Sequence, residues 1–157
     1  MNKTLIAAAL VCAGLLGNAT AWAQATDASM GKPMMDDQLY RTFGEKPGLV
    51  KLMDDFMLRL LADPRTGPFF KPANQQRIKE QLVDQFCMLT GGPCAYKGVD
   101  MKTSHRDLEI NKANFNALVE VLQQAMDAQR IPFRAQNQLL AKLAPMNRDI
   151  ITPKQEK

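Results

Sequence analysis

Apolar residues recur at three- and four-residue spacing along most of the chain from Leu39 onward, and this period constrains the fold more than any other feature. Four stripes of this kind follow one another, and no alternating pattern typical of β-strands accompanies them. The sequence therefore predicts an all-α domain built from amphipathic helices. The stripes comprise Leu49, Leu52, Met53, Phe56, Met57, Leu60 and Leu61; Ile78, Leu82, Phe86 and Leu89; Phe115, Leu118, Val119, Leu122 and Met126; and Leu139, Leu140, Leu143 and Met146.

Residues that break or cap helices separate the stripes. Proline and paired glycines end a helix, whereas asparagine before an apolar run favours a helix start. A shorter helix is expected ahead of the first stripe, from about Asp36 to Phe43. The expected boundaries are Asp63-Pro64 after the first stripe, Gly91-Gly92-Pro93 after the second, Asn111 as the N-cap of the third, and Pro132 and Pro145 around the fourth.

The first 25 residues have the pattern of a secretory signal peptide. Lys3 precedes an apolar run from Leu5 to Leu16, and small residues then allow cleavage after Ala23 or Ala25. The run is too short for a typical membrane-spanning helix, so a retained anchor is the less favoured alternative. The sequence predicts a periplasmic or secreted protein with no membrane span after cleavage.

The remainder of the 157-residue chain suits one domain and is too short for two sizeable cores. Residues 26–36 are polar and contain Gly and Pro, which indicates a flexible leader. We expect the helical domain to span residues 37–152 and a short C-terminal tail to span 153–157. The formal net charge of +4 is small and spread in mixed-sign clusters, so it does not indicate a nucleic-acid partner.

Three methionines in the leader, Met30, Met34 and Met35, leave open a copper(I) thioether site in an exported protein. A linker that happens to hold methionines is the favoured interpretation. A non-haem helical adaptor or copper-handling protein is accordingly kept as a remote alternative.

The cysteines change in number on export. Cys12 would leave with the signal peptide, and Val11 before it does not suit a lipoprotein signal. Cys87 and Cys94 remain, separated by Met-Leu-Thr-Gly-Gly-Pro, a segment that permits a tight reversal. In an oxidising compartment the sequence predicts a Cys87–Cys94 disulfide. Two buried thiols or a soft-metal pair are the alternatives, and no CxxC spacing supports the latter.

His105 is the only histidine in the chain. It lies in the stretch from Gly91 to Ile110, which is long and rich in Gly and Pro, and long connections in compact domains are usually functional. No HExxH, CxxCH, carboxylate pair or Gly-rich phosphate loop accompanies it. Hydrolytic zinc chemistry, covalently attached c-type haem and nucleotide binding therefore have no local support.

Several motifs keep a fixed order and spacing from Leu39 to His105 without a gap. They are Leu39-Tyr40, Phe56, Asp63-Pro64 followed by Phe69-Phe70, Gly91-Gly92, Tyr96 with Gly98, and Met101 with His105, and beyond them Ile110 with Phe115. Together they resemble the first group of truncated haemoglobins, the short globins with a two-over-two helical sandwich. The resemblance extends from Leu39 to about Ile151.

This resemblance implies a haem b protein with His105 as the proximal iron ligand, leaving the opposite face open for a diatomic gas. It implies non-covalent haem, because no histidine in the closing helix is available for a covalent link. It also assigns residues to the walls of the haem pocket. Candidates for contact with the haem propionates are Arg77, Lys97, Lys102 and Tyr96. The implied haem-binding residues are Phe56, Met57, Phe70, Ile78, Leu82, Phe86, Tyr96, Met101, Leu118 and Val119.

The distal side departs from the family pattern. Family members commonly carry Tyr directly after the Phe matched by Phe56, and Gln on the distal helix, whereas here the matching residues are Met57, Ile78 and Leu82. Gln81 is the only nearby amide, and helical geometry turns it toward the rim. The sequence predicts an apolar distal pocket that holds O2 weakly relative to CO. Met57 is expected to pack, with coordination of the iron as a sixth ligand the alternative.

The expected function is reversible binding of O2, CO or NO in the cell envelope by a monomer. A haem redox or NO-detoxifying role is the alternative, with an unidentified electron donor as a further partner. Catalysis is less favoured, because no distal acid–base residue is available for peroxide cleavage.

Overall fold

The computed structural model of the chain describes residues 37–151. The predicted signal peptide, the predicted leader with its three methionines, and the predicted C-terminal tail lie outside the described residues. The described residues form helices and no strand, as predicted. None of the described helices is long and apolar enough to cross a membrane. The elements are α1 Gln38–Thr42, α2 Glu45–Ala62, α3 Gly67–Phe70, α4 Gln75–Leu89, α5 Met101–His105, α6 Lys112–Ala128, α7 Phe133–Leu143, the 3-10 helix η1 Ala144–Met146, and α8 Asn147–Ile150.

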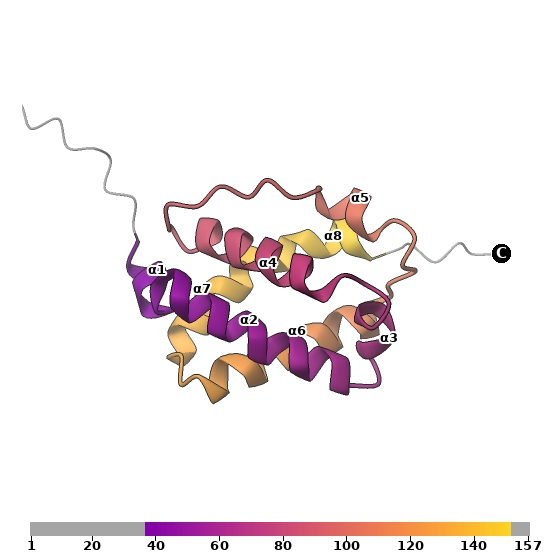
Figure 1. Cartoon of the computed structure of the whole chain (residues 1–157), viewed down its shortest axis with the longest axis horizontal. Helices are drawn as coiled ribbons and strands as arrows, with labels where there is room; N and C mark the ends of the chain where they lie inside the picture. The colour runs from indigo at the N-terminus through magenta and orange to yellow at the C-terminus, as the bar shows by residue number, and fades with distance from the viewer. Residues whose placement is uncertain (1–36, 152–157) are drawn as a thin grey trace, which may run out of the picture. The chain divides into compact units, whose positions relative to one another are not determined.

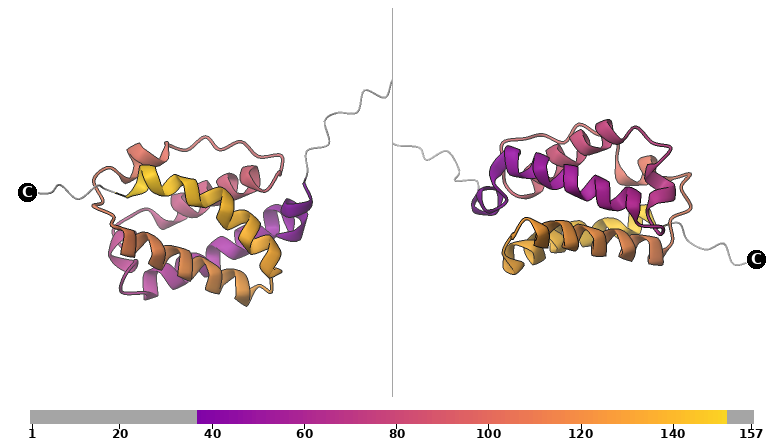
Figure 2. Two further views of the ribbon diagram at one scale, coloured as in Figure 1. Left: turned by 180° about the vertical axis from the view of Figure 1, so that it is seen from behind. Right: turned by 60° about the horizontal axis from the view of Figure 1, so that its bottom comes forward.

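The long helices form two layers of two. Helices α2 and α4 lie in one layer, and α6 and α7 lie in the other (Figure 1). The tilted view in Figure 2 separates the layers, with α2 above and α6 and α7 below. Helix α2 packs mainly on α4 within its layer and on α6 across the layers. This is the predicted two-over-two sandwich, and its connections leave α5 and α8 together at one end.

The apolar stripe of α2 supplies the centre of the core. Leu49, Leu52 and Leu60 are fully buried, and they meet Met126 of α6 and Leu139 of α7. A fully buried side chain of this size contributes about 1.5–3 kcal/mol relative to exposure. The predicted period of α2 therefore identifies the face that joins the two layers.

The predicted helix boundaries are confirmed. Helix α2 ends at Ala62, directly before Asp63-Pro64, and α7 begins after Pro132. At the start of α6 the Asn111 side chain accepts from the Asn114 backbone N–H, while the Asn114 side chain accepts from the Asn111 N–H. This reciprocal capping satisfies two backbone donors that a helix start leaves free.

Helix α1 matches the short helix expected from about Asp36 to Phe43, but the other short helices were not predicted, and α5 is the important one. The stretch from Gly91 to Ile110 was expected to be one long connection, but it contains α5. Five residues are too few for apolar periodicity to reveal a helix. The Asp100 carboxylate caps α5 by accepting from the Thr103 backbone N–H at 2.8 Å, and this bond lowers the pKa of Asp100.

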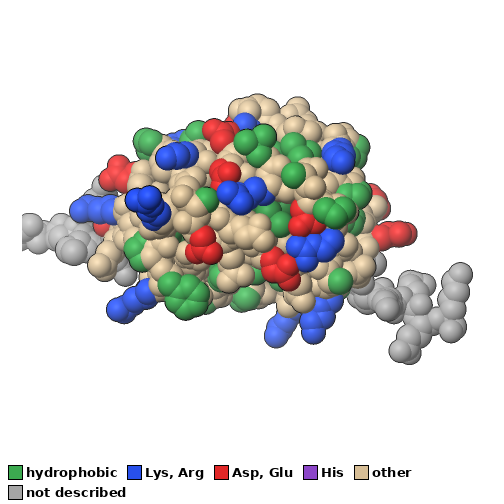
Figure 3. All heavy atoms as spheres, turned by 90° about the horizontal axis from the view of Figure 1, so that it is seen from below, with side chains coloured by type: hydrophobic (Ala, Val, Ile, Leu, Met, Phe, Trp, Pro, Cys, Tyr) green, Lys and Arg blue, Asp and Glu red, His purple; other side chains and the backbone are tan. Residues whose placement is uncertain are grey.

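Charged side chains of both signs are interspersed over the face drawn in Figure 3. Two ion pairs join the α2 and α4 helices: Lys46–Asp84 at 3.3 Å and Lys79–Asp54 at 2.6 Å. Exposed pairs of this type contribute about 0–1 kcal/mol each. The mixed charge agrees with the expectation from the sequence and places no basic stripe on that face of the described chain.

Candidate functional site

A cavity of about 520 Å³ opens between α4 and the segments α5, α6, η1 and α8. Its volume is in the range of small-molecule and cofactor sites, about 300–1,000 Å³. Most of its wall is apolar, and no Asp or Glu of residues 37–151 lines it. The cavity can therefore accept a large, mainly apolar molecule with acidic groups without repelling it.

The structure brings the predicted pocket residues together around this cavity, with one exception. They come from five helices, α2 to α6, and from the loop before α5, so segments far apart in the sequence meet at this cavity. The predicted residues that line the cavity are Phe56, Phe70, Ile78, Leu82, Phe86, Tyr96, Met101, His105, Leu118 and Val119.

Met57 is the exception. Its side chain is buried, with 4% exposure, but it does not belong to the cavity wall, although its neighbour Phe56 does. Successive residues of a helix point about 100° apart, so Phe56 and Met57 do not share a face. This placement agrees with the expected packing role of Met57.

His105 ends α5 and faces the cavity with one nitrogen already engaged. Its Nδ1 lies 2.7 Å from the Met101 carbonyl oxygen, and the Ser104 hydroxyl lies 3.0 Å from the same nitrogen. A carbonyl oxygen can only accept, so Nδ1 carries the hydrogen and donates it. In the neutral ring the lone pair is then on Nε2, which is the arrangement of a metal-ligating histidine held by an outer partner.

Loop residues 94–100 lead to α5 and cover one side of the cavity. The Tyr96 hydroxyl donates to the Val99 carbonyl oxygen at 2.8 Å and closes a tight turn around Gly98. A Cβ atom at Gly98 would collide with the Tyr96 hydroxyl and the Gln81 amide, so a larger residue here would have to displace both groups. Burial raises the pKa of Tyr96, and the Asp100 charge adds to the effect. The phenol therefore stays neutral as a donor.

The start of this loop is fastened to α4 by Cys87 and Cys94, whose sulfur atoms lie at disulfide distance. Cys87 is fully buried, one residue after the cavity-lining Phe86. A Cβ atom at Gly92 would lie 2.7 Å from the Cys87 sulfur and from the Tyr40 ring, so the reversal fits only glycine. The Cys87–Cys94 pair therefore joins the end of α4 to the loop that leads to α5 and His105.

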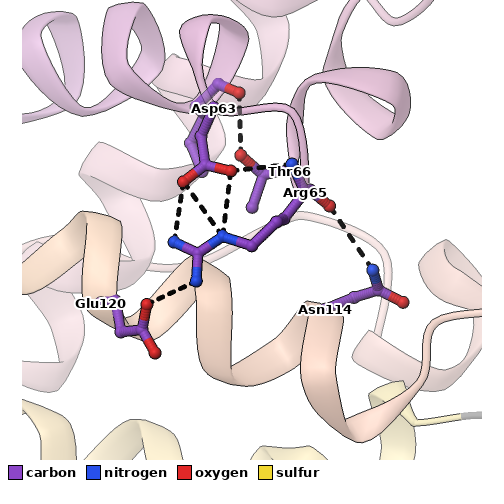
Figure 4. Close-up of polar contacts among 6 residues, drawn as sticks. Asp63, Arg65, Thr66, Asn114 and Glu120 are labelled. Carbon is purple, nitrogen blue, oxygen red and sulfur yellow. Dashed lines mark hydrogen bonds and ion pairs between the residues drawn. The ribbon is translucent and has the colours of Figure 1, made fainter.

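A polar cluster borders the cavity at the turn between α2 and α3 (Figure 4). Arg65 pairs with Asp63 at 2.8 Å and with Glu120 of α6 at 2.6 Å. The Asn114 amide donates to the Arg65 carbonyl oxygen, and the buried Thr66 hydroxyl donates to the Leu60 carbonyl oxygen. The hydrogen bonds from Arg65 lower the pKa of Asp63, and the bonds that Arg65 makes with Asp63 and Glu120 raise the pKa of Arg65. They fix the turn that leads to Phe69 and Phe70 on the cavity wall.

Sequence reasoning missed a buried amide in the wall. Gln81 lines the cavity as a partly buried residue beside Gly98, in keeping with its expected place at the rim. Gln85 also lines it and is only 5% exposed, so the expectation that Gln81 is the only nearby amide is wrong. The signal was present, since Arg77, Gln81 and Gln85 recur every four residues, on one face of α4.

Of the basic residues considered for propionate contacts, Arg77 lines the cavity, whereas Lys97 and Lys102 do not. The C-terminal part of the wall was also missed. Leu140, Leu143 and Met146 belong to the predicted fourth stripe but were not assigned to the pocket. Ile150 lies on α8, which is too short to show a period.

No group of three or more His, Cys, Asp or Glu residues is close enough to hold a metal ion within residues 37–151. A metal here would need most of its ligands from elsewhere. One imidazole with a free Nε2 in an apolar cavity fits an iron that an organic ring already holds on four sides. The donor set therefore fits haem.

Comparison with known proteins agrees with this fit. The family model described as bacterial-like globin matches residues 38–152. A group 1 truncated hemoglobin, GlbN of Mycolicibacterium paratuberculosis, is 30% identical over 114 residues, covering 73% of this chain and 84% of that protein. The group 1 truncated hemoglobin of Tetrahymena pyriformis is 31% identical over 93 residues, covering 59% of this chain and 74% of that protein.

Solved structures show the same fold. The Fe(III) form of the Tetrahymena pyriformis truncated hemoglobin superposes with a TM-score of 0.69 at 25% identity, covering 72% of this chain and 97% of that one. The 2/2 hemoglobin of a Synechococcus species, in the cyanomet state with covalently attached heme, gives a TM-score of 0.68 at 20% identity with the same coverage.

Proposed function

The chain belongs to the bacterial-like globin family, among the group 1 truncated haemoglobins, whose function is haem-based gas binding, and we propose that it binds haem b non-covalently with His105 as the proximal ligand. The observation that carries the proposal is the 2.7 Å contact between His105 Nδ1 and the Met101 carbonyl oxygen. This contact leaves the Nε2 lone pair free to hold an iron and would make the imidazole a better ligand. A bound haem would supply the iron on which a diatomic gas is held.

Other residues of the wall would hold the ring. Phe70, Phe86, Leu118 and Val119 would pack on it, and Arg77 is placed to meet an acidic group at the rim. The histidine count supports non-covalent binding, since His105 is the only histidine in the sequence and this proposal assigns it to the iron.

The proposal is tested by titrating the purified protein with ferric haem and recording the absorption spectrum. We expect a Soret band and one haem per chain for the wild type. His105→Ala should lose most of the affinity while its far-ultraviolet circular dichroism stays helical. An unchanged Soret band and affinity in His105→Ala would contradict the role of His105.

The wall formed by α4 leads to a proposal about the gas. Ile78, Leu82 and Phe86 present no donor, and the amide hydrogens of Gln85 are directed to methionine sulfurs. A hydrogen bond to a charged acceptor contributes about 1.5–3 kcal/mol. Without such a bond, O2 should be released about ten- to a hundredfold faster than from a pocket with Tyr or Gln donors.

Stopped-flow release of O2 and CO measures this directly. We expect fast release of O2 together with ordinary retention of CO. Leu82→Gln should slow the release of O2 with little change for CO. Release of O2 by the wild type as slow as in a relative with Tyr and Gln donors would rule out an apolar distal wall.

The location is also a proposal. The pattern of residues 1–25 and the Cys87–Cys94 pair both suit an exported protein, and disulfides persist in oxidising compartments. Cell fractionation of the full-length chain should place the processed protein outside the cytoplasm. Full-length protein confined to the cytoplasm would contradict export.

A further inference from the structure

Gln85 is a buried polar residue whose hydrogen bonding is left incomplete. It lies on α4, lines the cavity and is only 5% exposed. Its Nε2 lies 3.9 Å from the Met101 sulfur and 3.7 Å from the Met146 sulfur. Among residues 37–151, no donor reaches its Oε1. The carboxamide thus has only two weak thioether acceptors for its capacity of four hydrogen bonds.

A second buried glutamine provides the contrast. Gln136 of α7 is 3% exposed, and its Nε2 donates to the Asp127 carboxylate at 2.7 Å and to the Ile131 carbonyl oxygen at 2.9 Å. A buried amide is normally satisfied in this way, because an unsatisfied one is destabilising. Gln136 joins α7 to the end of α6, whereas Gln85 contributes no comparable bond to the fold.

The position of Gln85 indicates what it meets. Arg77, Gln81 and Gln85 form a polar row along α4, beside the apolar row of Ile78, Leu82 and Phe86. The polar row spans two helical turns, about 12 Å, from the exposed Arg77 to the buried Gln85. All three side chains line the cavity, and no carboxylate of the described residues does. The row is therefore suited to acidic groups on the edge of a bound molecule.

Haem has two such groups, its propionate carboxylates, and the rest of its edge is apolar. A carboxylate is a far stronger acceptor than a thioether, and its hydrogen bonds are charge-assisted. We propose that Gln85 is a haem-binding residue whose amide donates to a propionate carboxylate and so sets how the ring sits in the cavity. This inference rests on the proposed function, since it requires a porphyrin in this cavity.

The test compares porphyrins with and without free carboxylates, using the full chain. The variant is Gln85→Met, which keeps side-chain length and removes the donor, with Gln85→Leu as a second variant. The probes are iron-free protoporphyrin IX and its dimethyl ester, whose binding does not depend on the bond to His105. The measurement is the rate at which each porphyrin leaves the protein for an excess of a scavenger protein.

We expect Gln85→Met to lose protoporphyrin IX at least about tenfold faster than the wild type, equivalent to about 1.4 kcal/mol. The dimethyl ester should leave both proteins at the same rate. Before porphyrin is added, the variant should melt at the same temperature as the wild type or higher, because a poorly satisfied amide has been removed. The matched control Gln136→Leu should melt at a lower temperature and retain protoporphyrin IX as the wild type does.

The inference would be overturned if protoporphyrin IX left Gln85→Met and the wild type at the same rate. It would also be overturned if the substitution accelerated the loss of protoporphyrin IX and of its dimethyl ester equally. If Gln85→Met fails to fold, Gln85→Leu is judged by the same criteria. If neither variant folds, the expected melting result is contradicted and the inference is overturned. These outcomes leave the proposed function intact. That function fails on a different result, which is unchanged ferric haem binding in His105→Ala.

Discussion

The side of the molecule where α2 crosses α6 and α7 differs from the side where α4 faces α5 and α8. On the first side Leu49, Leu52 and Leu139 are fully buried in one hydrophobic cluster, and the Gln136 amide donates to oxygen acceptors. On the second side apolar residues such as Ile78 and Leu82 are only partly buried and line a cavity, and Gln85 faces sulfur. One side therefore stabilises the fold through its own buried residues, whereas the other side is shaped to bind a ligand.

The comparison is tested most severely by removing a leucine from each side. Leu60 is fully buried in the core, and Leu60→Ala should lower the free energy of unfolding by about 2–5 kcal/mol. Leu143 is partly buried on the cavity wall, and Leu143→Ala should cost less than about 2 kcal/mol while it accelerates haem loss. Urea unfolding before haem addition and haem transfer afterwards measure the two effects. Equal unfolding penalties for the two variants would break the distinction.

The Cys87–Cys94 pair lies between the two sides, because Cys87 belongs to the core and Cys94 begins the loop toward His105. In the chain-entropy model a closed loop this short contributes about 2.5 kcal/mol. We expect the Cys87→Ala, Cys94→Ala double variant to be less stable by that order and to lose haem faster. A reductant should reproduce both changes in the wild type. If haem loss is the same with and without reductant, the link has only a local structural role.

A smaller effect is expected at Asp100, which caps α5 on the cavity side. Its folded pKa lies below the ordinary value of 3.8, so the charged cap is present above that pH and is lost only as the pH falls through the lower folded value. Asp100→Ala should speed haem loss severalfold, equally from about pH 8 down to about pH 5. Asp100→Asn, which can still cap, should resemble the wild type. Haem transfer measured over this range gives the profile, and an Asp100→Ala effect that disappears between pH 8 and pH 5 would contradict this role.

The long helices could be predicted from the sequence, because apolar periodicity and breaker residues such as Pro64 and Pro132 are local signals, whereas their two layers and the family were expected from the resemblance. The place of His105 in the cavity was expected from the resemblance. The sequence did not reveal α5, η1 and α8, because helices this short carry no period. It also did not reveal the Nδ1 contact of His105 or the burial of Gln85, because both depend on how distant segments meet.

Amide hydrogen exchange of the full chain before and after ferric haem is added distinguishes the two sides most directly. We expect strong protection of α2 and α6 in both conditions, because their buried side chains belong to the shared hydrophobic core. Protection should rise on haem addition in α5, in loop residues 94–100, in η1 and in α8, with little change in α2. An equal rise in protection throughout the chain, or a rise confined to α2 and α6, would contradict the division between a core that stabilises the fold and a cavity that binds a ligand.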